Sequence, residues 1–223
     1  MKIGIITPME EEKRRIVEKL SINSEAEYAG QIFTEGFYQN NDVILTESGI
    51  GKVQAALAAT LLIEKYNIDL LINTGSAGAL NQDLEVGDTV IGTTTAYHDA
   101  DNTAFGYQYG QMPKQPLFFD SDIKTIQKLI EIEPDIKSGL IVSGDSFVNG
   151  ERKHQILKYF PNALAVEMES AAIAQVALQF KKPFVVIRSI SDKADGGASE
   201  SFDEFVVTAG IKSADLLLKF MDN

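Results

Sequence analysis

The stretch KIGIITPMEEE, residues 2–12, decides the fold. An unbroken apolar run at residues 3–6 leads into the turn dipeptide Thr7-Pro8 and then into three glutamates at 10–12. Continuous hydrophobicity is typical of a strand that is buried on both faces, which helices must cover. Acidic side chains at such a strand-to-helix turn either complement the dipole of the following helix or lie where open α/β sheets carry their chemistry. For this cluster alone, both interpretations stay open.

The same pattern recurs along the chain. Runs rich in Val and Ile predict further strands at residues 42–47, 70–74, 89–92, 139–143 and 184–190. Helical spacing of apolar residues predicts helices at 53–66, 122–132, 170–180 and 202–221, and the alternating segment 25–39 predicts an antiparallel hairpin. Irregular stretches are expected at 97–117 and 194–201, and a loop as long as the first is usually functional or disordered. We therefore expect one α/β domain over residues 1–223, with a mixed sheet.

The composition of the chain excludes several classes of function. With 44% hydrophobic residues among 223, the chain can bury a substantial core. The formal net charge is −12, so nucleic acids and membranes are not expected partners. There is no cysteine, and His98 and His154 lie far apart, so metal sites and Ser-His-Asp triads have little to draw on and no cofactor is expected. No leader precedes the first strand and no apolar run approaches the roughly 20 residues of a membrane span, so we expect a cytoplasmic protein.

Two glycine-rich segments follow predicted strands. Residues 48–53, SGIGKV, fail the phosphate-loop frame, because Thr46 and Val53 stand where that motif needs Gly and Ser or Thr. A turn whose glycines let the backbone approach a helix or a small ligand is the better interpretation. Residues 73–78, NTGSAG, are interpreted in the same way, as a turn whose small side chains leave space for a flat ligand.

Two further acidic sites lie near strand ends. In residues 166–170, VEMES, Glu169 is either the N-terminal acid of the next helix or a carboxylate that accepts hydrogen bonds from a paired diol. In residues 185–192, a strongly apolar strand carries Arg188 and ends at Asp192. Partial desolvation would raise the pKa of Asp192 and let it donate a proton near neutrality, whereas the alternative is an Asp that caps the following turn.

Seven motifs in one order and spacing extend over essentially the whole chain. They are IGII with MEEE within residues 3–12, SGIGKV at 48–53, NTGSAG at 73–78, YHDAD at 97–101, SGDSF at 143–147, VEME at 166–169 and SD at 191–192. Together they resemble the 5'-methylthioadenosine/S-adenosylhomocysteine nucleosidases of the purine nucleoside phosphorylase superfamily. The resemblance implies a three-layer α/β/α sandwich around a central mixed sheet, a homodimer, and hydrolysis of adenine thionucleosides to adenine and a thioribose product.

The resemblance also implies roles for individual residues. Glu12 matches the base that activates the attacking water, and Asp192 matches the acid that protonates adenine N7. Glu169 matches the carboxylate that binds the ribose hydroxyls, and Phe147 the ring that stacks on adenine. The other matched substrate-binding positions are Met9, Ile50, Ser76, Gly78, Val148, Glu167, Met168 and Arg188. Since Glu12 and Asp192 must hold opposite protonation states at one pH, we expect the base to be hydrated beside Arg188 and the acid to be less solvated.

Apolar residues in the irregular stretches match the pocket for the 5'-alkylthio group. They are Phe105, Met112, Pro113 and Phe202, and the resemblance implies that the 105–113 loop reaches in from the partner subunit. The alternative is that these residues only pin long loops to the core. Pro8 and Asn102 depart from the family pattern, at the base-bearing turn and near the tail pocket.

The implied cellular roles are methionine salvage and recycling of S-adenosylmethionine products. The sequence leaves open whether methylthioadenosine, S-adenosylhomocysteine, 5'-deoxyadenosine or a futalosine-type nucleoside is the main substrate.

Two other functions compete with this one. A nucleoside phosphorylase on the same fold would need a cationic cradle for phosphate. Here three glutamates stand at the first turn, and the residues directly before the segment 75–78 are Asn73 and Thr74, without an arginine. Helical spacing also directs Arg14 and Arg15 away from Glu12. A nucleoside-binding protein without catalysis is the second alternative, and the presence of all three carboxylates argues against it.

Overall fold

The computed structural model describes residues 1–222. The strands are β1 Lys2–Thr7, β2 Ser21–Tyr28, β3 Gln31–Tyr38, β4 Asn41–Glu47, β5 Leu70–Ala79, β6 Thr89–Tyr97, β7 Phe119–Asp120, β8 Lys137–Ser143, β9 Ala163–Glu167 and β10 Phe184–Asp192. The helices are α1 Glu10–Val17, α2 Lys52–Tyr66, α3 Ile123–Ile132, α4 Glu151–Tyr159, α5 Ser170–Phe180 and α6 Ala198–Met221, with a short 3-10 turn, η1, at Thr103–Phe105.

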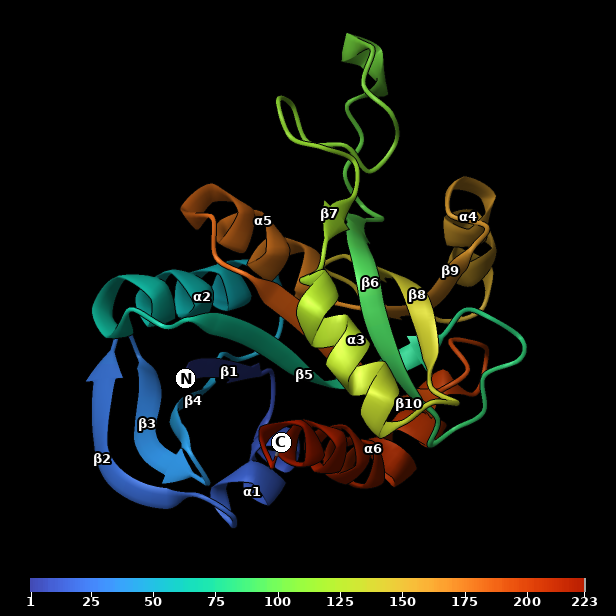
Figure 1. Cartoon of the computed structure of the whole chain (residues 1–223). Helices are drawn as coiled ribbons and strands as arrows, with labels where there is room; N and C mark the ends of the chain where they lie inside the picture. The colour runs from blue at the N-terminus through green and yellow to red at the C-terminus, as the bar shows by residue number, and fades with distance from the viewer. Residues whose placement is uncertain (223) are drawn as a thin grey trace.

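The strands form one mixed sheet in which β5 is shared by two parts (Figure 1). On one side of it lie β1, β4, β3 and β2 in that order, and β1 pairs in parallel with both β4 and β5. Beyond β1, the same edge of β5 pairs antiparallel with β9, and the opposite edge of β5 pairs in parallel with β10. Because β10, β6, β8 and β9 are also paired in turn, these strands close into a ring that returns to β5.

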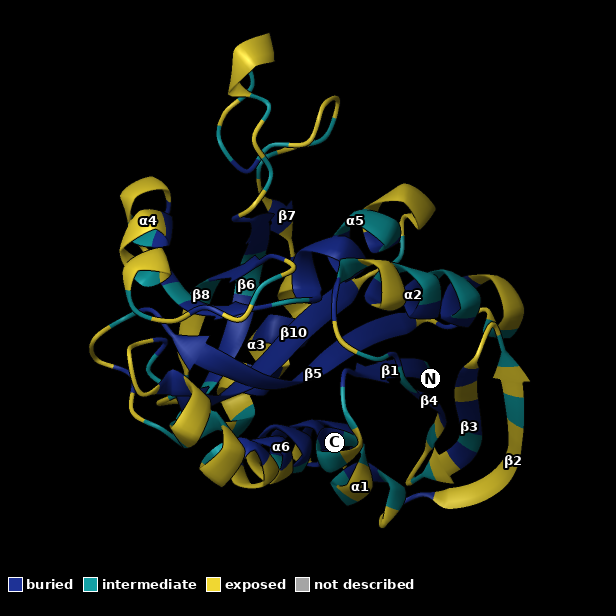
Figure 2. Cartoon of the chain, turned by 180° about the vertical axis from the view of Figure 1, so that it is seen from behind, coloured by how far each residue is buried: buried dark blue, intermediate teal, exposed yellow. Residues whose placement is uncertain are grey.

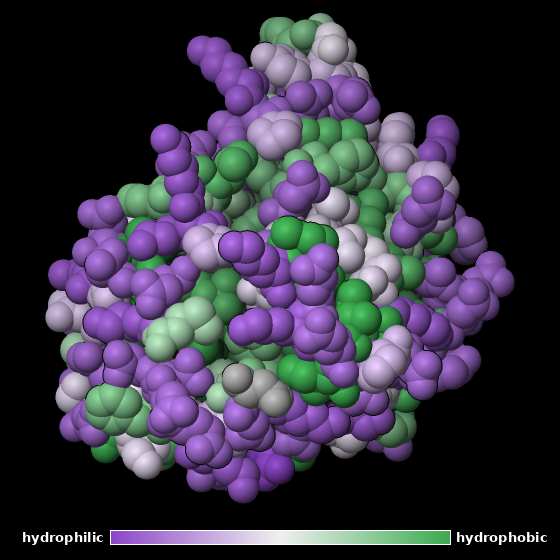
Figure 3. Space-filling model, viewed as in Figure 1, coloured by the Kyte–Doolittle hydropathy of each residue, from purple (hydrophilic) through white to green (hydrophobic). Residues whose placement is uncertain are grey.

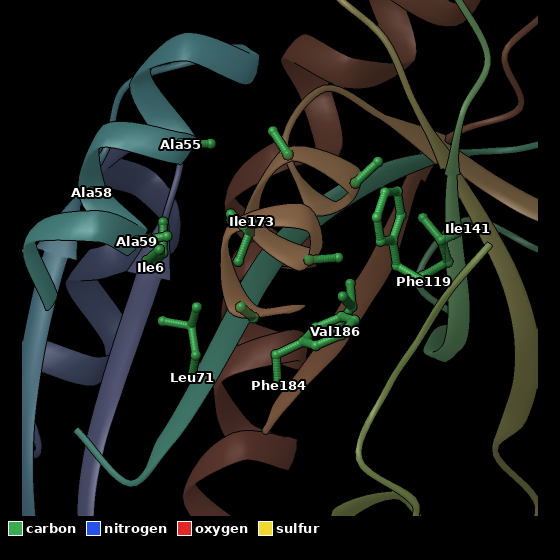
Figure 4. Packing of buried hydrophobic residues seen from close by; sticks show 14 of the residues in the cluster. Ile6, Ala55, Ala58, Ala59, Leu71, Phe119, Ile141, Ile173, Phe184 and Val186 are labelled. Carbon is green, nitrogen blue, oxygen red and sulfur yellow. The ribbon is translucent and has the colours of Figure 1, made fainter. Parts of the chain in front are cut away.

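Helices cover both faces of the sheet, which gives the expected three layers. Ile6 of β1 and Leu71 of β5 pack with the small side chains of α2 and with Ile173 of α5 (Figure 4). Ile3 and Ile5 of β1 belong to a second cluster with residues of α1, α3 and α6. The strand therefore alternates between two buried faces, which explains the unbroken apolar run. Figure 2 shows β1, β5 and β10 buried in the middle of the sheet, whereas β2 at its edge is exposed.

Most predicted elements are confirmed. The hairpin is β2 and β3, which pair antiparallel around Ala29 and Gly30, both with positive φ. The helix predicted at 170–180 is α5 with those bounds, and α2 begins one residue earlier than predicted, at Lys52.

Two expectations about secondary structure are wrong, and one helix has no predicted counterpart. Residues 73–78 are not a turn: β5 continues through them to Ala79, because each keeps a pairing partner on β10. The last helix begins at Ala198, so the irregular stretch after Asp192 is shorter than expected. The sequence does not predict helix α4, because it is a polar helix in which Ile156 is the one buried residue.

The projecting segment, residues 100–118, extends away from the body of the molecule between β6 and β7 (Figure 1). Its side chains include the exposed apolar residues Phe105, Met112 and Phe118. Apolar surface also gathers below the segment in Figure 3, against a mostly hydrophilic surround. Within residues 1–222, none of the helices has the length and apolar character that crossing a bilayer requires.

Candidate active site

A cavity of about 430 Å³ lies at the carboxyl ends of the strands. The segments that follow β1, β4 and β8 meet there with the last residues of β5, β9 and β10. Open α/β sheets bind ligands in this position. The lining residues that the sequence singled out are Met9, Glu12, Ile50, Ser76, Gly78, Phe147, Val148, Glu167, Met168, Glu169, Arg188, Asp192 and Phe202.

Glu12, in the first turn of α1, turns back toward β5. Its Oε1 accepts hydrogen bonds from the Ser76 amide at 2.7 Å and the Ser76 hydroxyl at 2.8 Å, and its Oε2 accepts one from the Met9 amide at 3.2 Å. Glu12 is only 1% exposed, so the expectation of a hydrated base is wrong. Burial raises its pKa, while the charge of Arg188 and the Ser76 hydrogen bonds act in the opposite direction.

Arg188 of β10 is a buried guanidinium shared among several acceptors. Its Nη2 donates to Glu167 Oε2 and to Asn73 Oδ1 and lies 3.3 Å from Glu169 Oε2. Its Nη1 donates to the Ser76 carbonyl at 3.2 Å. Because these groups already engage the guanidinium, Arg188 organises the acids around it and is not a free cationic site.

Glu167 lines the cavity, but protein groups bind its carboxylate. It accepts hydrogen bonds from the Ser143 hydroxyl and, through Oε2, from the Ser170 amide at 2.9 Å and the Ser170 hydroxyl at 2.8 Å, besides Arg188. These contacts join the ends of β8 and β9 to the start of α5. They favour a supporting role for Glu167 over direct substrate binding.

Glu169 occupies the N-cap position of α5, but its side chain makes no hydrogen bond to that helix. Its Oε1 accepts a hydrogen bond from the Gly51 amide at 2.9 Å, and its Oε2 faces Arg188. Burial, and then repulsion from Glu167, raise the pKa of Glu169 to about 8, against the lowering effects of Arg188 and the Gly51 amide. The interpretation of Glu169 as a simple helix N-terminal acid therefore does not describe its contacts.

Asp192 combines both of its predicted geometries. Its Oδ1 caps the following turn by accepting from the Ala194 amide at 2.8 Å, and its Oδ2 accepts from the Ser191 hydroxyl at 2.9 Å. The side chain also lines the cavity and is 2% exposed. Burial raises its pKa, partly offset by these two hydrogen bonds. A carboxyl group in this environment can hold a proton closer to neutral pH than an exposed one.

Two glycines of β5 make room for these side chains. A Cβ at Gly75 would lie 2.7 Å from both Arg188 Nη1 and Glu12 Oε1, and one at Gly78 would lie 2.8 Å from Asp192 Oδ1. The small residues of this segment lie in a strand and not in a turn, and the prediction that they leave space for a flat ligand stays a prediction. What they admit is the protein's own charged side chains.

Apolar side chains form another part of the wall. The ring of Phe147 lies 5.6 Å from that of Phe202, at an interplanar angle of 78°. Ile50 and Met168 line the same space. Carboxylates at one part of the wall and aromatic rings at another suit a ligand with a polar sugar and a flat base.

Some predicted residues lie elsewhere. Phe105 is 80% exposed in the projecting segment, and neither it nor Pro113 lines the cavity of its own chain. Asn102 also lies in that segment, where its side-chain amide donates to the Gln111 carbonyl at 2.9 Å. The predicted contribution of the 105–113 loop therefore depends on a second subunit.

Part of the lining was not predicted from the sequence. Residues not assigned to the site are Ala77, Ser146, Val166, Ser191, Ser199 and Asp203, and Pro8 was noted only for the turn. Most are sequence neighbours of predicted residues, which was the available signal. Among residues 1–222, no cluster of three His, Asp or Glu side chains has an arrangement suited to a metal ion.

Comparison with known proteins agrees with this geometry. The family described as the phosphorylase superfamily matches residues 2–222. A 5'-methylthioadenosine/S-adenosylhomocysteine nucleosidase of Staphylococcus aureus is 49% identical over 217 residues, which cover 95% of each chain. The chain belongs to this nucleosidase family.

Solved structures of the nucleosidase family and its relatives superimpose closely. The Streptococcus pneumoniae nucleosidase with the transition-state inhibitor MT-ImmA has a TM-score of 0.96 and 46% identity, covering 99% of this chain and 98% of that one. Futalosine hydrolase of Helicobacter pylori also has a TM-score of 0.96, at 35% identity, covering 100% and 97%. The nucleosidase fold is thus shared with a hydrolase named for a different nucleoside.

Proposed function

We propose that this chain hydrolyses the N-glycosidic bond of 5'-methylthioadenosine and S-adenosylhomocysteine, releasing adenine and the corresponding thioribose. One observation carries the proposal: Glu12, Glu169 and Asp192, from three separate parts of the chain, line a single cavity. The substrates are inferred from the names of the similar proteins, and the three carboxylates are suited to hydrolysis of an N-glycosidic bond.

In this mechanism Glu12 and Asp192 act on opposite sides of the bond. Glu12 takes a proton from water, whose oxygen bonds to the anomeric carbon of the ribose. Asp192 gives its proton to N7 of the purine, so the electron pair of the broken C–N bond leaves with neutral adenine. The raised pKa of Asp192 favours the protonated acid, and the hydrogen bonds from Ser76 and Met9 favour the ionised base.

Glu169 would act on the sugar. An ionised carboxylate accepts two hydroxyl hydrogen bonds, so it fits the ribose diol. The two hydroxyl donors favour ionisation of this carboxyl group, whose pKa is about 8 in the free site, and the positive charge that develops on the ribose as the bond breaks favours the carboxylate further. Its attraction for the sugar is therefore greater in the transition state than in the ground state, which is the condition for catalysis.

Phosphorolysis fits the cavity less well. Arg188, the arginine that lines it, already pairs with Glu167 and lies 3.3 Å from Glu169. A phosphate dianion placed beside Glu12 would meet like charge without a free cation. Arg14 is exposed, and Arg15 bonds to Asp215 at 2.8 Å, so neither turns toward the cavity.

We further propose that the protein is a homodimer. The exposed Phe105 and Met112 of the projecting segment are available to close the tail end of a partner's cavity, and the apolar surface in Figure 3 would be covered at the same time. We place the enzyme in the cytoplasm, in methionine salvage and in the removal of S-adenosylhomocysteine, because reactions that use S-adenosylmethionine produce both substrates.

The test is adenine release from methylthioadenosine, followed by absorbance, with and without phosphate. We expect turnover that is independent of phosphate and a loss of about 10²–10⁴-fold in kcat for Glu12→Gln and for Asp192→Asn. Glu10→Gln is the matched control, since Glu10 is exposed in the same helical turn. Phosphate-dependent turnover, or an Asp192→Asn enzyme within about tenfold of the parent, would contradict the mechanism.

The preference of the enzyme among the four candidate nucleosides is tested by a separate measurement. The kcat/KM values for methylthioadenosine, S-adenosylhomocysteine, 5'-deoxyadenosine and futalosine should be compared on one preparation. The proposal expects the two thionucleosides to be preferred, whereas a preference for futalosine would place the chain with the hydrolase of that name.

A further inference from the structure

We propose that Lys52, Asp99 and Asp145 form a three-loop clamp that fixes the purine-stacking wall relative to the ribose carboxylate. The inference rests on the proposed function. Lys52 opens α2, Asp99 follows β6, and Asp145 follows β8. None of the three lines the cavity, so their action is positioning and not chemical.

The clamp is bonded through both side chains and backbone. Asp99 Oδ2 accepts from Lys52 Nζ at 2.7 Å and from the Asp145 amide at 2.9 Å. Asp145 Oδ1 accepts from the Lys52 amide at 2.8 Å, and its Oδ2 lies 3.6 Å from Lys52 Nζ. Each member therefore contacts the other two, and none can move alone without breaking a bond.

Each end of the clamp is directly connected to the cavity. The residue before Lys52 is Gly51, whose amide donates to Glu169 at 2.9 Å. Two residues after Asp145 is Phe147, which lines the cavity. The loops pack closely, because a Cβ at Gly51 would lie 3.1 Å from Asp145 Oδ1 and its φ is +98°. The clamp thus sets the spacing between the carboxylate proposed for the ribose and the ring proposed for the purine.

Phe147 needs such support because its own side chain has little packing. It is 42% exposed, and its ring contact is with Phe202, near the start of α6. Its position therefore depends on its backbone. The clamp can hold that backbone in place, because Lys52 and Asp99 are each 26% exposed and the pair is partly shielded from water. Burial would raise the pKa of Asp99, but hydrogen bonds from Lys52 and Asp145 hold it below its usual value.

The test replaces Lys52 by methionine, which keeps most of the stem and removes the charge. Purine stacking is present before and during bond breaking, so its loss should raise KM and leave kcat nearly unchanged. We expect about a tenfold higher KM for methylthioadenosine, kcat within about twofold of the parent, and substantial recovery in Lys52→Arg. Lys137→Met is the matched control, because Lys137 pairs with Asp88 outside the cavity.

Adenine affinity, measured by titration calorimetry, separates this inference from the proposed function. A parent that binds adenine but releases none from methylthioadenosine contradicts the proposed function alone. A Lys52→Met protein with unchanged adenine affinity and unchanged KM overturns the clamp, even if its Tm is lower. Should Lys52→Met fail to fold, Asp99→Asn provides the same comparison, and it should weaken adenine binding by a similar factor.

Discussion

Replacing Gly78 by alanine would press a methyl group against the proposed catalytic acid. The new Cβ would lie 2.8 Å from Asp192 Oδ1, whereas ordinary contact begins at 3.4 Å, so the carboxylate must move by about 0.6 Å. The strand cannot yield instead, because Gly78 pairs with Val166 on one side and Asp192 on the other. A misplacement of about 1 Å can cost roughly 10²-fold in rate, so we expect kcat to fall by about 10- to 100-fold.

The assay is adenine release at saturating methylthioadenosine. Gly92→Ala is the matched control: its Cβ would lie 3.1 Å from Ile141 and Val186, at a position in β6 that does not line the cavity. Both variants should lose about 1–3 kcal/mol of stability from overpacking, but only Gly78→Ala should lose kcat. Equal losses of kcat in the two variants, or a Gly78→Ala enzyme within about threefold of the parent, would refute the reasoning.

Four further outcomes are expected. Since Asp192 must be protonated and Glu12 ionised, kcat should fall as pH rises through the pKa of the acid and as pH falls through that of the base; a flat profile across both limbs would exclude this pair. The Glu169 carboxyl, with its pKa raised from 4.5 to about 8, stabilises the fold fully below pH 4.5 and loses that contribution as pH rises toward 8. Glu169→Gln should therefore have a higher Tm than the parent above about pH 8, a similar Tm near pH 4, and little activity, as thermal scans and the adenine assay can check. Asp203 is an exposed carboxylate on the cavity lining, so it is placed to attract the ammonium group of a homocysteine tail. Asp203→Asn should lower kcat/KM for S-adenosylhomocysteine by about three- to tenfold and leave methylthioadenosine unchanged, and equal effects on both would contradict that role. Phe105→Ala should raise KM for methylthioadenosine if the partner's segment closes the tail pocket, and sedimentation would show whether the dimer persists.

Sequence reasoning succeeded where a local pattern has one physical solution. The apolar run of β1 had to be buried on two faces, and the alternation at 25–39 had to form a hairpin. It failed for residues 73–78, because glycine and small residues favour turns locally while pairing with β10 holds them in β5. The closed ring of strands also depends on pairing between distant segments, which no local pattern encodes.

In the candidate site, too, the residues could be predicted from the sequence, whereas their surroundings depend on the fold. The motif resemblance assigned Glu12, Glu169 and Asp192 to one site, but their protonation depends on how topology buries them. The burial of Glu12 was predicted incorrectly, since only the folded chain brings Ser76, which is distant in sequence, to its carboxylate. The clamp around Lys52 was not anticipated either, because it joins three loops whose spacing follows from the whole fold.

The central position of β5 has a consequence for how this protein can change. The strand is hydrogen-bonded to β1 and then β9 along one edge and to β10 along the other, so its amides should exchange with deuterium only when the whole domain opens. The wall that β5 contributes to the cavity, which includes Ser76 and Gly78, is thereby held in place, while Ile50 and Phe147 lie in loops. Divergence toward new nucleosides would then proceed through loop substitutions, leaving the bond-breaking apparatus untouched.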